Sequence, residues 1–263
     1  MGRKIAIVSG KGGVGKTTIV AGIGKALARR GASVCLIDMD VGLNNLDVLL
    51  NCNKKVNYDV VDCVKSRVRI KQALICDNDL DNLYFLSCNK EREFDDINYK
   101  DFVDLTDKLA SVFDFVIIDS PAGKGEAYKF AVLGANEIIV VATPHIVSIR
   151  DADKLISGLK GLNKENIKLV INRIRGDLVM SKQMLSHEEV QSLIRIPLLG
   201  VVPESDQINI FSSLKFDNIN EQVACSFNIL ARNLRYDKPI IYDYKSRYKG
   251  VLGLIRRRLK RSV

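Results

Sequence analysis

The sequence predicts an α/β fold: a doubly wound, mostly parallel sheet with helices on both faces, followed by a C-terminal amphipathic helix. Two observations on the chain of 263 residues lead to the sheet. Short apolar runs rich in branched residues alternate with helical patterns. These runs are nearly continuous in apolar residues, as expected of parallel strands that are covered on both faces. Ligands of such folds bind at the carboxyl ends of the strands, so the residues that follow each run are the first candidates for a site.

Each apolar run is expected to be one strand, because it is too short for a buried helix and rich in branched side chains. In chain order the expected strands are KIAIVS (4–9), SVCLIDMD (33–40), YFLS (84–87), DFVIIDS (114–120), EIIVVAT (137–143), IKLVIN (167–172) and PLLGVVP (197–203).

The stretches between the strands place apolar residues at helical spacing and are expected to be helices. The expected helices lie at roughly 16–30, 101–112, 126–134, 148–161, 187–194 and 219–234. Two of them open with the pattern of a capping box, Ser148 with Asp151 and Ser186 with Glu189, in which each side chain satisfies a free backbone N–H group.

The positive charge of the chain lies at its C-terminal end. Residues 245–263 contain eight Lys or Arg and no acid, so removing them from the net charge of +9 leaves +1 for residues 1–244. A nearly neutral body with a strongly basic tail indicates a local anionic partner of the tail, not a generally basic surface.

The cysteines and histidines give no sign of a metal or redox site. The cysteines form no C-x-x-C pair and are expected to be free thiols in a reducing cytosol. His145 and His187 are expected to be incidental, which argues against histidine-based catalysis. No apolar run approaches about 20 residues, so no membrane span is expected, and no signal peptide is expected before Ile5. The cysteines are Cys35, Cys52, Cys63, Cys76, Cys88 and Cys225.

The string SGKGGVGKTT, residues 9–18, matches the phosphate-binding P-loop pattern. It follows an apolar strand and opens a helix, so its backbone N–H groups and the positive helix terminus can surround a phosphate. We expect Lys16 to pair with the β- and γ-phosphate oxygens and Thr17 to place its hydroxyl on Mg²⁺. The nucleotide-binding candidates of this loop are Gly10, Lys11, Gly12, Gly13, Val14, Gly15, Lys16, Thr17 and Thr18.

The substring KGGVGKTT, with its second lysine, resembles the deviant Walker A motif of the MinD/ParA superfamily of ATPases, which includes nitrogenase iron protein. The resemblance implies that Lys11 crosses a dimer interface to the partner's nucleotide. A cation delivered in this way stabilises charge that develops on the transferring phosphoryl group, as an arginine finger does. Lys11 and Lys16 are therefore expected to be catalytic, together with Asp40, whose role follows from the carboxylates below.

Carboxylates follow two of the expected strands. The spacing of Asp38 and Asp40 from the glycines would also suit a dinucleotide-binding fold, and the P-loop decides for the ATPase interpretation. Asp40 resembles the switch I carboxylate that orients the attacking water, and Asp38 resembles a Mg²⁺ ligand that acts through water. Asp119, at the end of FVIID, resembles the Walker B carboxylate that holds Mg²⁺ directly or through water. The superfamily builds its adenine pocket at the positions of Asn172, Arg173, Pro203 and Glu204.

Within the superfamily the chain resembles the MinD family most closely, over most of its length. The segments that carry this resemblance are DMDVGLNNLD, DFVIIDSPAG, NEIIVVATPHIVSIRDADKLI, MLSHEEVQSLIRIPLLGVVPE and the tail. The resemblance implies an ATP-dependent homodimer, peripheral on the inner face of the bacterial cell membrane, that recruits the division inhibitor MinC and is released by hydrolysis. A second factor, MinE or a polar scaffold, is a possible partner, and no specific nucleic acid is expected. The implied partner-binding residues are Asn44, Asn45, Asp47, Asp151 and Asp153.

The tail has the pattern of a basic amphipathic helix that lies in a lipid headgroup layer. At about 100° per residue its apolar and basic side chains fall on opposite faces, with only Arg258 intruding on the apolar one. The expected division is an ATPase domain over 1–239, a hinge over 240–247 and this helix over 248–263. The expected membrane contacts are Val251, Leu252, Leu254, Ile255, Arg256, Arg257, Leu259 and Lys260.

The chain also departs from the MinD pattern. Gly125 replaces the switch II glutamate, Glu126 follows one place later, and Asn44 stands where the family usually has Arg. Two alternatives stay open: a flagellar-number regulator of the MinD type and a ParA-type DNA-segregation ATPase. An iron–sulfur reductase is disfavoured, because residues 114–136 contain no cysteine to bridge a dimer.

Overall fold

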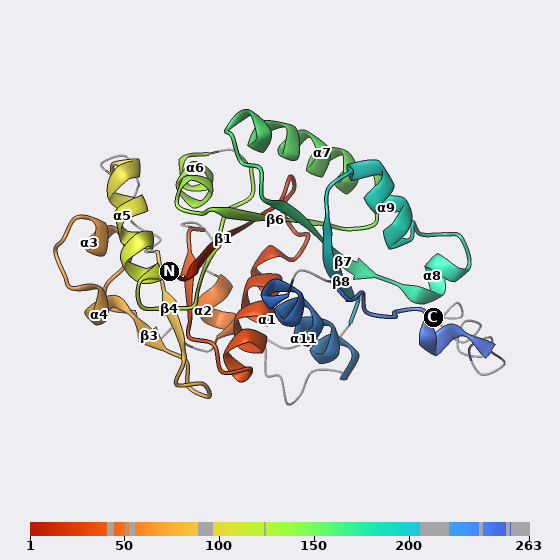
Figure 1. The fold of residues 1–263 in the computed structure, drawn as a ribbon, viewed down its shortest axis with the longest axis horizontal. Coiled ribbons are helices and arrows are strands. Elements are labelled where there is room, and N and C mark those ends of the chain that lie inside the picture. The colour runs from red at the N-terminus through yellow and green to blue at the C-terminus, as the bar shows by residue number, and fades with distance from the viewer. Residues whose placement is uncertain are drawn as a thin grey trace.

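The computed structural model describes residues 1–40, 45–50, 52, 56–88, 97–123, 125–205, 221–236, 239–250 and 253. The strands of these residues form one sheet in the order β3-β4-β2-β5-β1-β6-β7-β8 (Figure 1). All neighbouring pairs are parallel except β3 and β4, which are antiparallel. The strands are β1 (Arg3–Val8), β2 (Val34–Asp38), β3 (Ile75–Cys76), β4 (Leu83–Leu86), β5 (Phe115–Asp119), β6 (Glu137–Ala142), β7 (Ile167–Ile174) and β8 (Leu198–Pro203).

Helices connect the parallel strands and cover both faces of the sheet. They are α1 (Lys16–Arg29), α2 (Asn45–Leu49), α3 (Val60–Val64), α4 (Ile70–Ala73), α5 (Tyr99–Ala110), α6 (Glu126–Leu133), α7 (Ile146–Gly161), α8 (Gly176–Met180), α9 (His187–Ile194) and α11 (Glu221–Arg235), with a 3-10 helix η2 (Ser246–Tyr248). Figure 1 shows α5, α6, α7 and α9 on one side of the sheet and α1 and α11 on the other.

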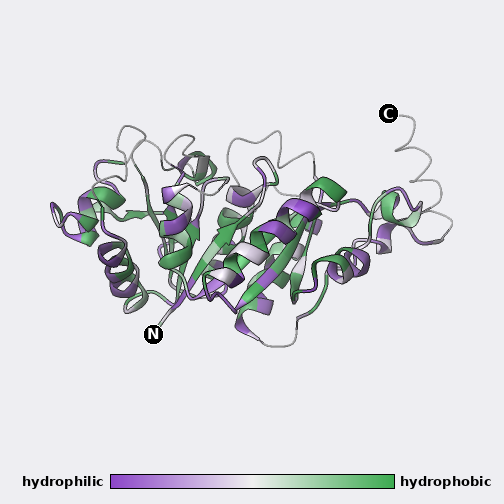
Figure 2. Cartoon of the chain, turned by 90° about the horizontal axis from the view of Figure 1, so that it is seen from above, coloured by the Kyte–Doolittle hydropathy of each residue, from purple (hydrophilic) through white to green (hydrophobic). Residues whose placement is uncertain are grey.

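The sheet separates two buried apolar clusters, as the doubly wound prediction requires. Along β1, Ala6 and Val8 belong to the cluster beneath α5, α6, α7 and α9, whereas Ile5 and Ile7 belong to the cluster beneath α1 and α11. Successive strand residues point to opposite faces, so a strand covered on both sides must be apolar throughout. Figure 2 shows these mostly hydrophobic strands between helices that mix hydrophobic and hydrophilic residues. The predicted fold class is confirmed.

The boundaries differ from the prediction at a few places. β2 ends at Asp38, two residues before the predicted end, and β7 continues to Ile174. The capping box of Ser186 and Glu189 is confirmed at the start of α9. The predicted capping box of Ser148 is wrong: α7 begins at Ile146, and the Ser148 hydroxyl inside its first turn accepts the backbone N–H of Thr143 at 3.0 Å.

The segment 240–247, expected to be a hinge, lies against the body. Tyr244 is buried, and Ile240 is hydrogen-bonded through its backbone to Asn233 of α11. The expected amphipathic helix beyond it falls almost entirely outside the described residues, and so do its predicted membrane contacts.

Candidate functional site

The phosphate loop connects the carboxyl end of β1 to the amino end of α1. Gly13 has φ +77 and Gly15, the N-cap of α1, has φ +91, both in the left-handed region that favours glycine. This backbone path leaves the first N–H groups of a 14-residue helix at the loop. The positive end of the helix dipole adds to their attraction, so the loop is built to accept an anion.

Neighbouring elements hold the loop from the side. A Cβ atom on Gly10 would lie 2.4 Å from the backbone oxygen of Asp151 in α7. A Cβ on Gly15 would lie 2.4 Å from the side-chain nitrogen of Asn172 in β7, and that nitrogen donates a hydrogen bond of 2.8 Å to the Val14 carbonyl. These close approaches require glycine and fix the loop against β7 and α7.

The two lysines of the loop lie in different surroundings. Lys16, the first residue of α1, is only 8% exposed. Lys11 is exposed, and no described carboxylate forms an ion pair with it. Lys16 is therefore buried at the chain's own phosphate loop, whereas Lys11 is exposed to solvent.

Asp38 and Asp119 end neighbouring strands in register, and both are almost completely buried, at 0% and 1% exposure. One carboxylate oxygen of Asp38 accepts the backbone N–H of Asp40 at 2.9 Å. Among the described residues, no donor meets hydrogen-bond geometry at its other oxygen or at either oxygen of Asp119, although the Thr17 hydroxyl lies near Asp119. Such groups are costly to bury unless a ligand completes them.

Burial also changes the protonation of these carboxyls. Burial raises the pKa of Asp119 to about 7, against the opposing effects of the Thr17 hydroxyl and the Lys16 ammonium. Burial, and then the negative charge of Asp119, raise the pKa of Asp38 well above its usual range. Two acidic groups beside each other resist ionising together unless a cation is added.

This donor set fits Mg²⁺ bound together with a phosphate. Buried carboxylate oxygens without partners beside a hydroxyl are hard oxygen ligands. No group of three or more His, Cys, Asp or Glu side chains in the described part of the chain could hold a metal by itself. Mg²⁺ usually keeps several waters and takes one or two carboxylates plus substrate phosphates, so the residues present suit it.

A small cavity of about 80 Å³ opens beside the phosphate loop. It brings together four residues that the sequence assigned to an adenine pocket, two from the loop region, and Ser205. Its lining residues are Gly15, Thr18, Asn172, Arg173, Pro203, Glu204 and Ser205. The ends of β7 and β8 are joined there, because the Glu204 N–H donates to the Ile174 carbonyl at 3.1 Å. The cavity thus lies where the two strands end, next to the first turn of α1.

The predicted partner-binding residues are only partly visible. Asn44 and the side chain of Asn45 lie outside the described residues. Asp47 is 9% exposed in α2 and presents little surface. Asp151 is half-buried and Asp153 is exposed, both on α7. Asp40 is half-buried at the end of the described segment that carries Asp38.

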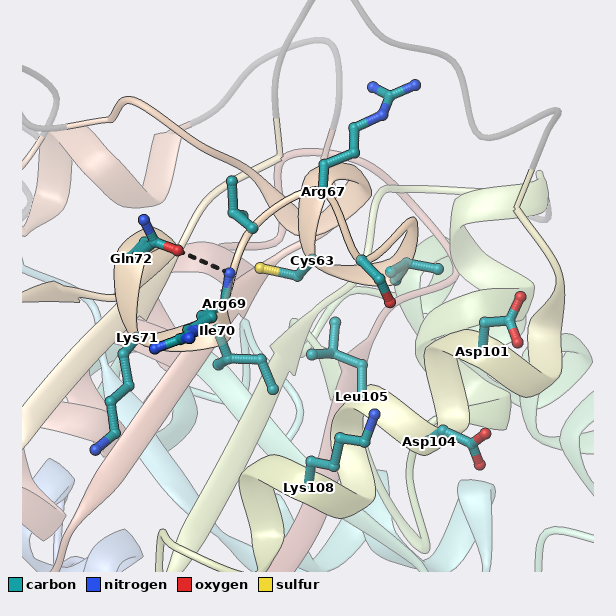
Figure 3. A pocket seen from close by; sticks show the side chains of 13 residues that line it. Cys63, Arg67, Arg69, Ile70, Lys71, Gln72, Asp101, Asp104, Leu105 and Lys108 are labelled. Atoms are coloured by element: carbon teal, nitrogen blue, oxygen red, sulfur yellow. Dashed lines mark hydrogen bonds between the residues drawn. The ribbon is translucent and has the colours of Figure 1, made fainter.

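Sequence reasoning missed two surface features. Ile146 and Val147, at the amino end of α7, are 51% and 59% exposed although they are apolar. A hollow of about 850 Å³ lies between the α3–α4 segment and α5, with Leu105 and Ile70 among its apolar lining and charged side chains around it (Figure 3). No predicted site residue lines this hollow, and no motif in the sequence signals it.

Comparisons with known proteins agree with the geometry. Residues 5–213 match the family described as the CobQ/CobB/MinD/ParA nucleotide binding domain. The septum site-determining protein MinD of Synechocystis is 38% identical, covering 98% of this chain and 99% of that protein. MinD of Thermotoga maritima is 36% identical, covering 97% of each.

Two solved structures have a similar fold. One is a MinC:MinD cell division protein complex from Aquifex aeolicus, with a TM-score of 0.83 and 32% identity, covering 90% of this chain and 97% of that chain. The other is MinD from Pyrococcus horikoshii complexed with Mg-ADP, with a TM-score of 0.78 and 28% identity, covering 89% of this chain and 96% of that chain.

Proposed function

The chain belongs to the MinD/ParA family of nucleotide-binding proteins, and from this premise we propose that it is a membrane-associated ATPase that positions the division septum. In this proposal ATP joins two subunits, the dimer holds the membrane through its tails and recruits MinC, and hydrolysis separates the subunits.

The phosphate loop supplies the binding part of the reaction. Backbone N–H groups at the start of α1 and the Lys16 ammonium would bind the β- and γ-phosphates. Thr17 and Asp119, with Asp38 through water, would hold Mg²⁺, which neutralises charge on the phosphate oxygens. The adenine would occupy the cavity at Asn172 and Pro203, whose position beside the loop supports this assignment.

Lys11 and Asp40 supply the part of the site that acts on the γ-phosphate. The exposed Lys11 would enter the partner subunit's site and stabilise charge on the transferring group. Asp40 would orient the attacking water at the edge where β2 ends. Phosphoryl transfer depends mainly on such positioning and charge stabilisation, so neither residue has to act as a strong base.

The observation that carries the proposal is the set of unpartnered carboxylate oxygens of Asp38 and Asp119 directly beside the phosphate loop. A buried polar group of a stable protein is normally completed by a partner. A metal–nucleotide complex supplies that partner at this place, whereas a purely structural role for the two carboxylates leaves their burial unexplained.

Membrane binding is assigned to the tail. No helix in the described part of the chain is long and apolar enough to cross a bilayer. A short basic amphipathic helix binds weakly, at about 1 kcal/mol for each basic residue near an anionic surface. Two tails on one dimer raise the overall affinity by roughly 10²–10⁴ fold, so dimerisation by ATP becomes the signal for membrane binding.

MinC is the proposed partner of the membrane-bound dimer, because the MinD of the Aquifex aeolicus complex is similar over 90% of this chain. The exposed Asp153 on α7 is a candidate contact. We expect Asp153→Ala to weaken co-sedimentation of purified MinC with vesicle-bound protein without changing vesicle binding itself. Unchanged MinC recruitment would remove Asp153 from the interface.

Sedimentation with anionic vesicles in ATP, ADP or a slowly hydrolysed analogue tests the function. We expect binding with ATP and the analogue, little binding with ADP, and loss of binding when residues 248–263 are deleted. Lys11→Ala and Lys16→Ala should weaken binding because neither variant can complete the dimer. Wild-type binding by the deletion variant would refute the tail assignment.

A DNA mobility-shift measurement separates this function from a ParA-type role. Non-specific phosphate contacts weaken steeply with salt, so we expect no ATP-dependent shift at about 200 mM salt. A shift that persists at that concentration would favour DNA segregation over septum positioning.

A further inference from the structure

Residues 239–248 connect α11 to the tail, and their contacts with the body are specific. The first is at Asn233, which is 4% exposed near the end of α11. Its side-chain nitrogen donates to the carbonyls of Leu199 at 2.8 Å and Ile240 at 2.7 Å, and its side-chain oxygen accepts the Ile240 N–H at 2.9 Å. One buried amide thus satisfies both backbone groups of Ile240 and ties the segment to the beginning of β8.

The second contact is at Tyr244, which is also 4% exposed. Its hydroxyl lies 2.9 Å from Nδ1 of His187 and accepts the His187 backbone N–H at 3.3 Å, and the two rings meet edge to face with centroids 5.6 Å apart. Lys245 beside it forms an ion pair with Glu188 at 3.5 Å. Burial raises the pKa of Tyr244 to about 12, so the phenol stays neutral at physiological pH.

Gly176, the first residue of α8, lets the segment approach the body closely. A Cβ atom there would lie 2.1 Å from the Tyr244 carbonyl oxygen and 2.9 Å from Cδ2 of Tyr248. Close packing continues past this point, because a Cβ on Gly253 would lie 2.2 Å from the Tyr248 carbonyl carbon. Only a residue without a side chain fits at position 176, so the docked position of the segment is built into the body.

The two contacts lie near opposite ends of the strands. Leu199 is in the first part of β8, whereas α8 follows the carboxyl end of β7. The segment therefore carries the chain from the amino ends of the strands back to their carboxyl ends, where the phosphate loop also lies. A hollow of about 740 Å³ at these carboxyl ends is lined both by Lys245 and by Pro144, His145 and Ile146 at the start of α7.

We propose that residues 239–248 form a fixed strap, held by the contacts of Tyr244 with Gly176 and His187. The strap fixes the point where the membrane tail leaves the body, at the carboxyl ends of the strands beside the nucleotide site. This inference rests on the proposed function, in which two subunits meet at that site. The strap brings both tail origins close to the dimer interface, so that the two tails reach one patch of membrane together.

The effect of releasing the strap follows from chain statistics. About ten freed residues have a root-mean-square span of roughly 17 Å, so each tail origin would wander over that distance. The effective concentration of the second tail at the membrane falls approximately as the −3/2 power of linker length. For a linker that becomes about three times longer, this relation gives a vesicle affinity roughly fivefold lower, which sets the scale of the expected effect.

Two variants release the strap in different ways, and two others serve as controls. Gly176→Ala places a methyl group against the Tyr244 backbone, and Tyr244→Ala removes the buried ring. Tyr244→Phe keeps the buried ring and should retain most of the vesicle binding of the wild type. Gly161→Ala at the end of α7, where a Cβ meets nothing within 4 Å, should behave as wild type.

The experiment uses the full chain with ATP and vesicles of phosphatidylethanolamine and phosphatidylglycerol. We expect Gly176→Ala and Tyr244→Ala to be cut faster by trypsin in the strap, at Lys245 or Arg247. Both should bind vesicles about fivefold more weakly, with ATP-dependent dimerisation in solution and ATPase activity without vesicles unchanged.

Different failures point to different conclusions. Wild-type trypsin resistance in both variants would overturn the lock at Tyr244. A released strap with wild-type vesicle affinity would overturn the role in tail placement, while loss of binding on deleting 248–263 would still support the proposed function. Membrane binding that survives that deletion would instead overturn the proposed function itself.

Discussion

Replacing Asp119 by asparagine should stabilise the nucleotide-free protein. An aspartate ionises near 3.8 when unperturbed, whereas burial raises the pKa of Asp119 to about 7. Between these values the folded protein holds a proton that the unfolded chain has released, so this group makes stability fall as pH rises from about 4 to 7. The Asp119→Asn substitution removes the ionisable group, so the folded protein no longer loses this stability as the pH rises.

The size of the gain depends on pH. At about 1.4 kcal/mol for each pKa unit, the cost of the buried carboxyl is about 4 kcal/mol at pH 8 and about 1–2 kcal/mol at pH 5. For a chain of this length the gain corresponds to a Tm rise of roughly 10 °C at pH 8 and 4 °C at pH 5. Loss of the Asp119 charge also relieves Asp38, whose pKa that charge raises.

Thermal and denaturant unfolding of the protein stripped of nucleotide with EDTA measures this gain. Asp153→Asn, an exposed control on α7, should change stability little at either pH. Adding Mg²⁺ and ADP should stabilise the wild type and leave Asp119→Asn almost unchanged, because ligands stabilise only the folded state that binds them. The reasoning is refuted if Asp119→Asn is less stable than wild type at pH 8, or gains equally at pH 5 and pH 8.

Three further substitutions test other contacts. Asn172→Ala loses the hydrogen bond to Val14 and should raise the Kd for ATP about fivefold, as measured by titration calorimetry. An unchanged Kd would show that this amide does not support ATP binding by the loop. Lys16→Ala should lower ATP affinity by at least about 100-fold in the same measurement, and near-normal affinity would place the phosphates elsewhere. Gly22→Ala in α1 puts a Cβ 2.2 Å from the Phe227 ring and should cost about 1–3 kcal/mol in denaturant unfolding while the folded protein binds ATP normally.

The central elements were predictable because burial on both faces leaves a strong pattern. β1, β5 and β6 are buried along almost their whole length, and each contains an unbroken apolar run of at least four residues next to a charged end. The short helices were missed for the opposite reason. α3 and α4 have five and four residues, too few to repeat the apolar spacing by which a helix is recognised. The capping box of Asp59 and Asp62 at α3 was a usable signal that periodicity alone overlooks.

The start of α7 was misplaced because its first turn does not follow the pattern of a surface helix. Ile146 and Val147 are exposed apolar residues, so they mark no buried face and the polar Ser148 appeared to open the helix. Apolar side chains left in water at an edge that binds ligand are typical of a contact surface. The local rule failed at the start of the helix to which the proposed function assigns a MinC contact.

The residues of the site were predictable, but their support was not. Motif and resemblance together selected Lys16, Asp38 and Asp119, whereas the contact between Asn172 and Val14 spans 158 positions of the chain. The strap was missed because a polar, charged segment after a helix is typical of a linker. Its burial depends on Gly176, which lies far from it along the chain, and on Asn233, which is seven positions before Ile240 but carries no pattern that predicts the contact.

The single chain presents two incomplete charge arrangements at one edge of its sheet. Asp38 and Asp119 are two buried carboxylates beside the one ammonium of Lys16, and Lys11 is an exposed cation that forms no ion pair with a described carboxylate. Under the proposed function, a metal–nucleotide complex completes the first arrangement within one subunit, and a second subunit's phosphates complete the other. In this proposal charge couples nucleotide binding to dimerisation, without any need for a large movement of the fold. In the same proposal, a strap that delivers the tail to the carboxyl ends of the strands extends this coupling to the membrane, because subunits that share nucleotides also bring their two proposed lipid-binding segments together.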